Sequence, residues 1–211
     1  MVDIIIFSLI LLFFLILIFI IFWKFYFLRN PERIIPKGNT IVSPADGKII
    51  KILRLKDIGK INLKKGIIGK IKTLISDTCK DGYLLTIMMN LHNVHVQRSP
   101  VEGVVLSINY SPGKFKSAVH GDRFVHGLEN EKNEIIIQNN KLGKIKVIQI
   151  AGILARRIEC FVAKNQKLIK GQRIGRINLG SQVALIIPTK LSLSVNEGDK
   201  VRGGETIIAK Y

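Results

Sequence analysis

A glycine–serine pair interrupts an apolar segment that otherwise has the composition of a buried β-strand. In GRINLGSQVALIIP, residues 175–188, apolar and β-branched residues predict a strand that closes at Pro188. Gly180 and Ser181 lie in the middle of that segment. Glycine weakens a strand interior and usually marks a bulge or a close approach of two backbones. The pair therefore indicates an irregular backbone beside a hydroxyl, which becomes a nucleophile only when a base removes its proton.

Two of the four histidines lie close together, in MNLHNVHVQRSPVEG (89–103). If this segment is extended, His92 and His95 face opposite sides, whereas a turn at Asn93 brings both to one pocket. Two histidines so close, in a chain with so few, favour a functional site over a structural one. A metal site would need a third ligand, and no cysteine or H-x-x-E motif is nearby, so we expect no metal.

After these histidines, the next candidate functional residue is Asp46, a carboxylate in SPADGK (43–48). The sequence Pro-Ala-Asp-Gly is also typical of a turn, in which the aspartate side chain bonds its own backbone. Taken alone, the turn is the better interpretation of Asp46.

The N-terminus predicts a membrane anchor. Ile4 to Trp23 are 20 consecutive residues without a charge, which matches the hydrocarbon core of a bilayer, about 30 Å thick. A cleaved signal peptide would have a shorter apolar region, basic residues before it and a small-residue cleavage site after it. Here Asp3 precedes the apolar run and no such site follows. We therefore expect a retained, single-pass transmembrane helix.

The charge distribution predicts the orientation of this anchor. All 33 Lys and Arg residues follow the apolar run, and the net charge is +18. The positive-inside rule then places the following domain in the cytoplasm, at the cell membrane. The basic residues are scattered among apolar runs, which favours attraction to an anionic membrane, or simply a lysine-rich composition, over nucleic-acid binding. Cys79 and Cys160 form no disulfide framework, which fits a reducing compartment.

The chain after the anchor is predicted to be mostly β. We divide the whole chain into an anchor with a juxtamembrane segment (1–35) and a β-rich domain (36–211), which we expect to be a sandwich or barrel. The expected strands are short apolar runs between Gly, Asn, Asp and Pro: GKIIKILRL, GYLLTIMM, VHVQ, GVVLSINY, NEIIIQN, GKIKVIQI, CFVA, QVALII and TIIAKY.

Two internal repeats refine the expected fold. SPADGKIIKI (43–52) is similar to SPVEGVVLSI (99–108), and VAKNQKLIKGQRIGRI (162–177) is similar to VNEGDKVRGGETIIAK (195–210). The second pattern also occurs in biotinyl and lipoyl carrier domains, so we expect two interlocked hammerhead-like units. Carrier domains hold a modified lysine at a hairpin tip, and the corresponding MMN (88–90) has none.

Together, several motifs give the chain a resemblance to a known family. They are FLRNPERIIP, SPADG, HNVHVQRSPVEG, ENEKN, IQIAGILARRI and GRINLGS. With these motifs, residues 25–211 resemble the phosphatidylserine decarboxylases, in particular the short, single-anchor type of archaea and some bacteria. In that family the protein cuts its own Gly-Ser bond. The new N-terminal residue becomes a pyruvoyl group, which is the only cofactor.

The resemblance assigns a role to each candidate residue in the cleavage. Ser181 Oγ would attack the carbonyl carbon of Gly180, with His95 as the base and Asp46 orienting it, as in a catalytic triad. The resulting ester would break by β-elimination and leave the pyruvoyl group on residue 181. The two subunits would be residues 1–180 and 181–211.

The resemblance also implies the second reaction. Phosphatidylserine in the bilayer would form a Schiff base with the pyruvoyl group, lose CO₂ and become phosphatidylethanolamine. His92 resembles the residue proposed to return a proton to the substrate. An anchored domain suits a lipid that cannot leave the bilayer easily.

Other functions stay open at this point. One is a non-enzymatic, membrane-tethered carrier domain of the biotinyl or lipoyl type, which would remain uncut. Another is decarboxylation of the archaeal ether lipid archaetidylserine, whose head group is the same. A nucleic-acid module is disfavoured by the uncharged anchor, and a homo-oligomer is compatible with the sequence.

Overall fold

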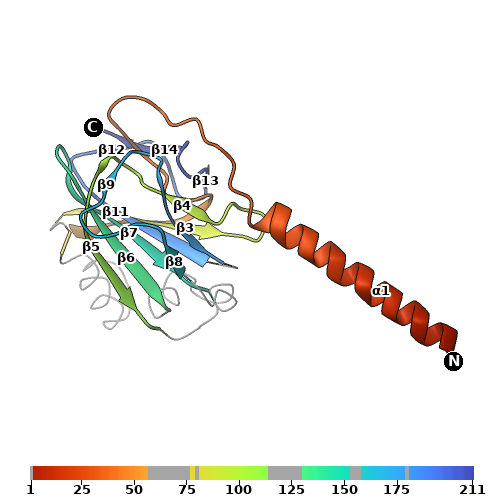
Figure 1. The fold of residues 1–211 in the computed structure, drawn as a ribbon. Helices are drawn as coiled ribbons and strands as arrows, with labels where there is room; N and C mark the ends of the chain where they lie inside the picture. The colour runs from red at the N-terminus through yellow and green to blue at the C-terminus, as the bar shows by residue number, and fades with distance from the viewer. Residues whose placement is uncertain (1, 57–76, 79–80, 114–129, 153–157, 179–180) are drawn as a thin grey trace.

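A long N-terminal helix projects from a β-rich body (Figure 1). The computed structural model describes residues 2–56, 77–78, 81–113, 130–152, 158–178 and 181–211. Helix α1 (Val2–Ile21) continues into a short π-helical segment, η1 (Phe22–Phe27). Together they form an apolar stretch, Asp3–Phe27, that is long enough to cross a membrane, and its residues from Asp3 to Phe22 are exposed. The helix is thus exposed along its length, as a bilayer-spanning segment requires.

The described residues after the helix are mostly β, as the sequence predicts. The strands are β1 (Thr40–Val42), β2 (Gly47–Arg54), β3 (Gly82–Met89), β4 (Val96–Arg98), β5 (Gly103–Ser111), β6 (Lys132–Asn139), β7 (Gly143–Ile150), β8 (Ile158–Cys160), β9 (Lys167–Leu168), β10 (Arg173–Ile177), β11 (Ser181–Pro188), β12 (Ser192–Leu193), β13 (Lys200–Val201) and β14 (Ile207–Lys210). Two expected strands differ: only Val96 and Gln97 of VHVQ belong to β4, and only Cys160 of CFVA belongs to β8.

An eight-stranded antiparallel sheet forms the body, in the order β13-β2-β3-β11-β7-β6-β5-β9. Strand β11 lies at its centre, between β3 and β7. Val183, Leu185 and Ile187 of β11 are fully buried and belong to the hydrophobic core. Because side chains alternate along a strand, Ser181 lies on the same, core-facing side as these three residues.

The two halves of this sheet are related by the sequence repeats. Strands β2 and β5 begin at the glycines of the two SP-x-x-G repeats, and β13 and β9 pair with these strands in the same register. At Gly47 an added Cβ would lie 2.3 Å from the Met88 carbonyl oxygen, and at Gly103 it would lie 2.3 Å from that of Gln138. Glycine is therefore required at both equivalent positions, where two backbones approach closely.

The two loops that precede these glycines are equivalent in the repeats, and they form hydrogen bonds with each other. The Val42 amide donates to the Pro100 carbonyl (3.0 Å), and the Arg98 amide donates to the Pro44 carbonyl (2.8 Å). The repeated segments thus contact one another directly.

The segment around the glycine–serine pair is not one strand, and here the sequence-based interpretation is wrong. Strand β10 belongs to a three-stranded sheet with β4 and β8, whereas β11 belongs to the eight-stranded sheet. The chain crosses from one sheet to the other between Ile177 and Ser181. The pair marks this crossing, and its Gly180 lies outside the described residues.

Candidate functional site

Ser181 is the first residue of β11 and is almost completely buried, with 1% of its surface exposed. It lies opposite Met89, the last residue of β3. Its Oγ has no hydrogen-bond partner within the part of the chain that the structure describes. A buried hydroxyl without a partner is energetically unfavourable, which makes it a candidate for a reactive group.

His95 is equally buried, with 1% of its surface exposed, and its ring is held in one tautomer. Its Nδ1 lies 2.9 Å from the backbone carbonyl oxygen of Asn93. Since a carbonyl only accepts hydrogen bonds, Nδ1 carries the proton and Nε2 carries the free lone pair. That Nε2 is buried and has no partner among the described residues. The ring is therefore arranged as a base.

The fold brings this base to the connection that contains the glycine–serine pair. Strand β4, which follows His95, pairs with β10, and the Ile177 amide donates to the His95 carbonyl oxygen (3.2 Å). On the other side, Ser181 pairs with Met89, from which the chain turns towards His95. His95 thus borders the start of the 178–181 connection, and Ser181 ends it.

Burial controls the pKa of His95. Loss of hydration lowers the pKa from 6.5 to about 4, because a charged imidazolium is unfavourable in this environment. The hydrogen bond to Asn93 raises the pKa, the positive charge of Arg29 lowers it, and the negative charge of Asp46 raises it. At neutral pH the imidazole is therefore uncharged and able to accept a proton.

Phe27, at the end of η1, covers this histidine. The Phe27 side chain is fully buried, and its ring centroid lies 4.4 Å from that of His95. Trp23 stacks on the other side of Phe27, at 4.7 Å. The end of the apolar helix thus forms part of the wall that keeps water away from the candidate base.

We expect Phe27→Ala to raise the pKa of His95 towards 6.5, because water would reach the imidazole. The measurement is the self-cleavage rate of freshly synthesised precursor in nanodiscs after transfer to buffers between pH 3.5 and 8. Its midpoint should move from about 4 in the wild type towards 6.5 in the variant. Phe25→Ala is the matched control, since Phe25 is 71% exposed on the same segment. An equal midpoint in the wild type and Phe27→Ala would contradict this role.

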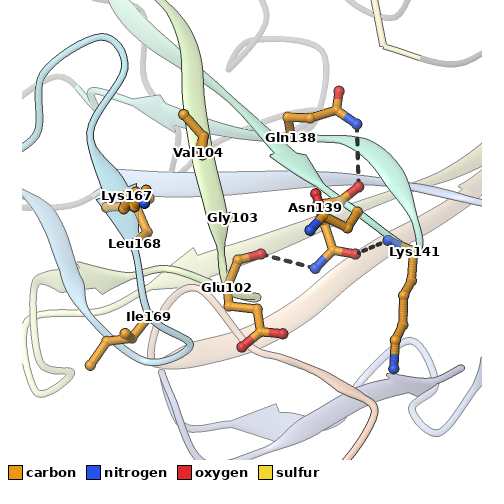
Figure 2. A pocket seen from close by; sticks show the side chains of 10 residues that line it. Glu102, Gly103, Val104, Gln138, Asn139, Lys141, Lys167, Leu168 and Ile169 are labelled. Carbon is orange, nitrogen blue, oxygen red and sulfur yellow. Dashed lines mark hydrogen bonds between the residues drawn. The ribbon is translucent and has the colours of Figure 1, made fainter.

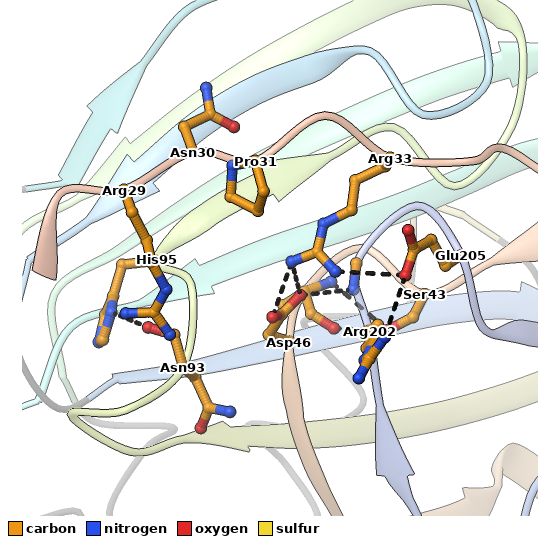
Figure 3. Close-up of polar contacts among 12 residues, drawn as sticks. Arg29, Asn30, Pro31, Arg33, Ser43, Asp46, Asn93, His95, Arg202 and Glu205 are labelled. Carbon is orange, nitrogen blue, oxygen red and sulfur yellow. Dashed lines mark hydrogen bonds and ion pairs between the residues drawn. The ribbon is translucent and has the colours of Figure 1, made fainter. Parts of the chain in front are cut away.

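Asp46 does not form the expected hydrogen bond with His95. Arg33 Nη2 donates to both carboxylate oxygens of Asp46, at 3.0 and 2.9 Å, and the Gly203 amide donates to Oδ1 at 2.7 Å (Figure 3). Arg33 also pairs with Glu205 at 3.3 Å. Asp46 therefore fastens the segment after the helix to the domain, and its negative charge raises the pKa of His95.

The two histidines of the motif point in different directions. A turn does form, since the Asn93 amide donates to the Asn90 carbonyl (2.9 Å), but it leaves His92 exposed while His95 is buried. His92 Nδ1 lies 3.3 Å from the Tyr26 hydroxyl of η1. His92 thus lies on the outer side of the turn, facing the end of the apolar helix.

A chain of buried amide side chains supports the backbone of His95, and sequence reasoning missed it. Asn133 donates to Gln149 (2.9 Å), Gln149 donates to Gln97 (2.8 Å), and Gln97 donates to the His95 carbonyl oxygen (2.9 Å). These residues are nearly fully buried, so the connected amides fix one another's orientation. The available signal was Gln149 at a core-facing position of the apolar run GKIKVIQI.

A separate cleft of about 460 Å³ lies between β5, β9 and the end of β6 (Figure 2). Asn139, which lines it, is at the opposite end of β6 from Lys132, the residue that pairs with Ile150 beside Gln182. The cleft is therefore separated from Ser181 by the length of the sheet, and it is not the site formed by Ser181 and His95.

Comparison with known proteins identifies the family of the chain. The family model described as phosphatidylserine decarboxylase matches residues 22–209. The chain belongs to the phosphatidylserine decarboxylase family. The match includes η1 and all of the site residues described above, whereas α1 precedes it.

Individual relatives give the same result. A protein of Desulfotalea psychrophila is 41% identical over 186 residues, which are 88% of this chain and 78% of the relative. A Chlorobium phaeobacteroides protein is 38% identical over 193 residues (91% and 81%), and one of Rickettsia bellii is 37% identical over 190 residues (90% and 75%). All three are named phosphatidylserine decarboxylase proenzyme. A proenzyme is a precursor that is processed, as the family resemblance implies for Gly180–Ser181.

Proposed function

We propose that this protein cuts its own chain between Gly180 and Ser181 and then decarboxylates phosphatidylserine to phosphatidylethanolamine. The observation that carries the proposal is the pair of buried reactive atoms, Ser181 Oγ and His95 Nε2, which have no partner among the described residues. They flank the connection between β10 and β11, and the chain belongs to a family whose relatives are named proenzymes.

In the first reaction, His95 removes the proton of the Ser181 hydroxyl, and Oγ attacks the Gly180 carbonyl carbon. The neutral imidazole has its lone pair on Nε2, because Nδ1 donates to Asn93. The amide becomes an ester, and β-elimination then separates residues 1–180 from residues 181–211. Asp46 contributes through its charge, which favours the imidazolium that forms when His95 takes the proton.

The surroundings of Ser181 fit the pyruvoyl group that this cleavage would produce. Residue 181 is buried beside Met89, and its side-chain oxygen has no protein partner in the described structure, so a carbonyl oxygen can replace the hydroxyl without losing a hydrogen bond. Once formed, the group supplies an electron acceptor for the loss of CO₂ from an amino acid. We propose that His92, which is exposed on the turn that precedes His95, returns the proton to the substrate carbon.

The helix fits a substrate that stays in a membrane. Helix α1 is apolar enough to span a bilayer, and Phe27 at its end contacts His95. We propose that it is a single-pass anchor of the cell membrane with the β-rich domain in the cytoplasm, and that it holds the site at the level of the lipid head groups.

The alternatives are less well supported. A carrier domain would need a modifiable lysine at 88–90, which the sequence lacks, whereas family membership favours the enzyme. The matched relatives are named for phosphatidylserine, which favours that lipid over archaetidylserine. The equivalent contacts of Gly47 and Gly103 support two interlocked hammerhead-like units as the description of the fold.

The test is the intact mass of the purified protein under denaturing conditions. We expect two chains in place of one of 23.7 kDa, the smaller one beginning at residue 181 and blocked to Edman degradation. Borohydride should reduce the blocking carbonyl and add the corresponding mass to the small chain alone. A single, unmodified chain that still releases CO₂ from phosphatidylserine would contradict the proposal.

A further inference from the structure

Arg29 lies between the end of the apolar helix and the candidate site. Its guanidinium lies over the Tyr26 ring, with Cζ 4.2 Å from the ring centroid. Nη1 donates to the Tyr26 carbonyl (2.7 Å) and Nη2 donates to the His92 carbonyl. Figure 3 shows the side chain extending to His95 and Asn93. These contacts fix the position of the guanidinium but use only two of its five N–H groups.

The charge of Arg29 has no acidic partner among the residues that the structure describes. By contrast, Arg33 pairs with Asp46 and Arg173 pairs with Glu32. A half-buried, positioned and unpaired guanidinium with free donors is a site for an anion, which it binds in a forked geometry.

The position of Arg29 selects which anion of the substrate it would bind. The residue lies two positions beyond the apolar stretch Asp3–Phe27, so if that stretch spans the bilayer as proposed above, Arg29 lies near the lipid phosphates. A cation on the reacting carboxylate would stabilise the ground state, because that charge is lost with CO₂. A cation on the phosphodiester stabilises substrate and transition state alike and orients the serine part towards residue 181.

We propose that Arg29 binds the phosphodiester of the lipid head group and thereby positions the serine moiety beside His92 and residue 181. This inference rests on the proposed decarboxylase function. It assigns head-group recognition to the segment that joins the helix to the domain.

The experiment compares two soluble substrates, a short-chain phosphatidylserine and an O-alkyl serine that lacks the phosphodiester. With the short-chain lipid, Arg29→Gln should raise KM by roughly 10- to 100-fold, the range for loss of a charge-assisted contact, and should change kcat much less. Arg29→Lys should recover part of the loss. With the O-alkyl serine, kcat/KM should be equal in the wild type and Arg29→Gln.

Two further measurements keep this test separate from that of the proposed function. Self-cleavage of Arg29→Gln, followed by intact mass, should be complete, since His95 and Ser181 are unchanged. Lys24→Gln, which removes an exposed charge of η1, should leave KM for the soluble lipid unaltered. If the wild type is uncut or inactive, the proposed function fails.

If the wild type is active, other outcomes overturn the role of Arg29 alone. These are an unchanged KM in Arg29→Gln, or an equal loss of kcat/KM on both substrates. If Arg29→Gln is not cut, kcat/KM on the two substrates is compared between the wild type and Arg29→Lys instead. An equal loss of kcat/KM on both substrates again overturns the proposal.

Discussion

Ser181→Ala should remain a single chain of 23.7 kDa and release no CO₂ from phosphatidylserine. The substitution removes the hydroxyl that, in our proposal, attacks the Gly180 carbonyl, so neither the cut nor the carbonyl group should form. Because both reactions depend on this atom, the loss of decarboxylation should be complete, below the detection limit of ¹⁴CO₂ release.

The same variant should be at least as stable as the uncut wild-type precursor. Ser181 Oγ is buried without a hydrogen bond among the described residues, and an unsatisfied buried hydroxyl costs about 1–3 kcal/mol. Removing it should leave the melting temperature in detergent unchanged or raise it. Ser192→Ala is the matched control, because Ser192 is exposed in β12 and this variant should be cut and active. Turnover by Ser181→Ala would refute the pyruvoyl assignment.

His95→Gln should accumulate as precursor, with self-cleavage slowed by about 10²- to 10⁴-fold, the usual contribution of a general base. In the wild type, the cleavage rate should rise with pH through a midpoint near 4 and stay constant to pH 8, since only the neutral imidazole accepts the proton. Pulse synthesis followed by a pH jump and gel analysis measures both quantities.

His92→Gln separates the two reactions. This variant should be cut at a normal rate, because His92 is exposed and does not contact Ser181, but its decarboxylation should be slower. Normal cleavage in His95→Gln would show that another group is the base.

The buried neutral His95 also makes the fold sensitive to acid. Between pH 6.5 and about 4, the unfolded chain binds a proton at this residue and the folded chain does not. Stability is therefore full above pH 6.5 and decreases by about 3 kcal/mol as the pH falls towards 4. Urea unfolding of Ser181→Ala, with and without His95→Gln, isolates this contribution, which should be absent from the double variant.

Local sequence patterns predicted most of the elements. The expected strand GYLLTIMM is β3 residue for residue, and GKIKVIQI is β7. These strands depend on alternating or continuous apolar residues bounded by glycine, a signal contained in a few neighbouring positions. The prediction of one strand through Gly180 was wrong, because a change of sheet between β10 and β11 has the same local composition as a bulge within one strand.

The interaction partners of the site residues could not be predicted from local sequence patterns. Asp46, Arg33 and His95 all lie in motifs, yet the sequence did not indicate that Asp46 pairs with Arg33 instead of His95. Such a pairing depends on distances between side chains that are remote in sequence. The same applies to Phe27, whose contact with His95 joins the helix to a turn 68 residues later.

The sequence by itself determined the apolar helix, the β-rich class, the two repeats and the family. These properties depend on composition and on motifs that are continuous along the chain. Only the tertiary structure decided the environment of the chemistry: the tautomer of His95, its cover by Phe27, the ion pair of Asp46 and the unpaired Arg29. Burial and pairing arise from segments that meet in space, and such long-range contacts set the pKa and orientation of each group.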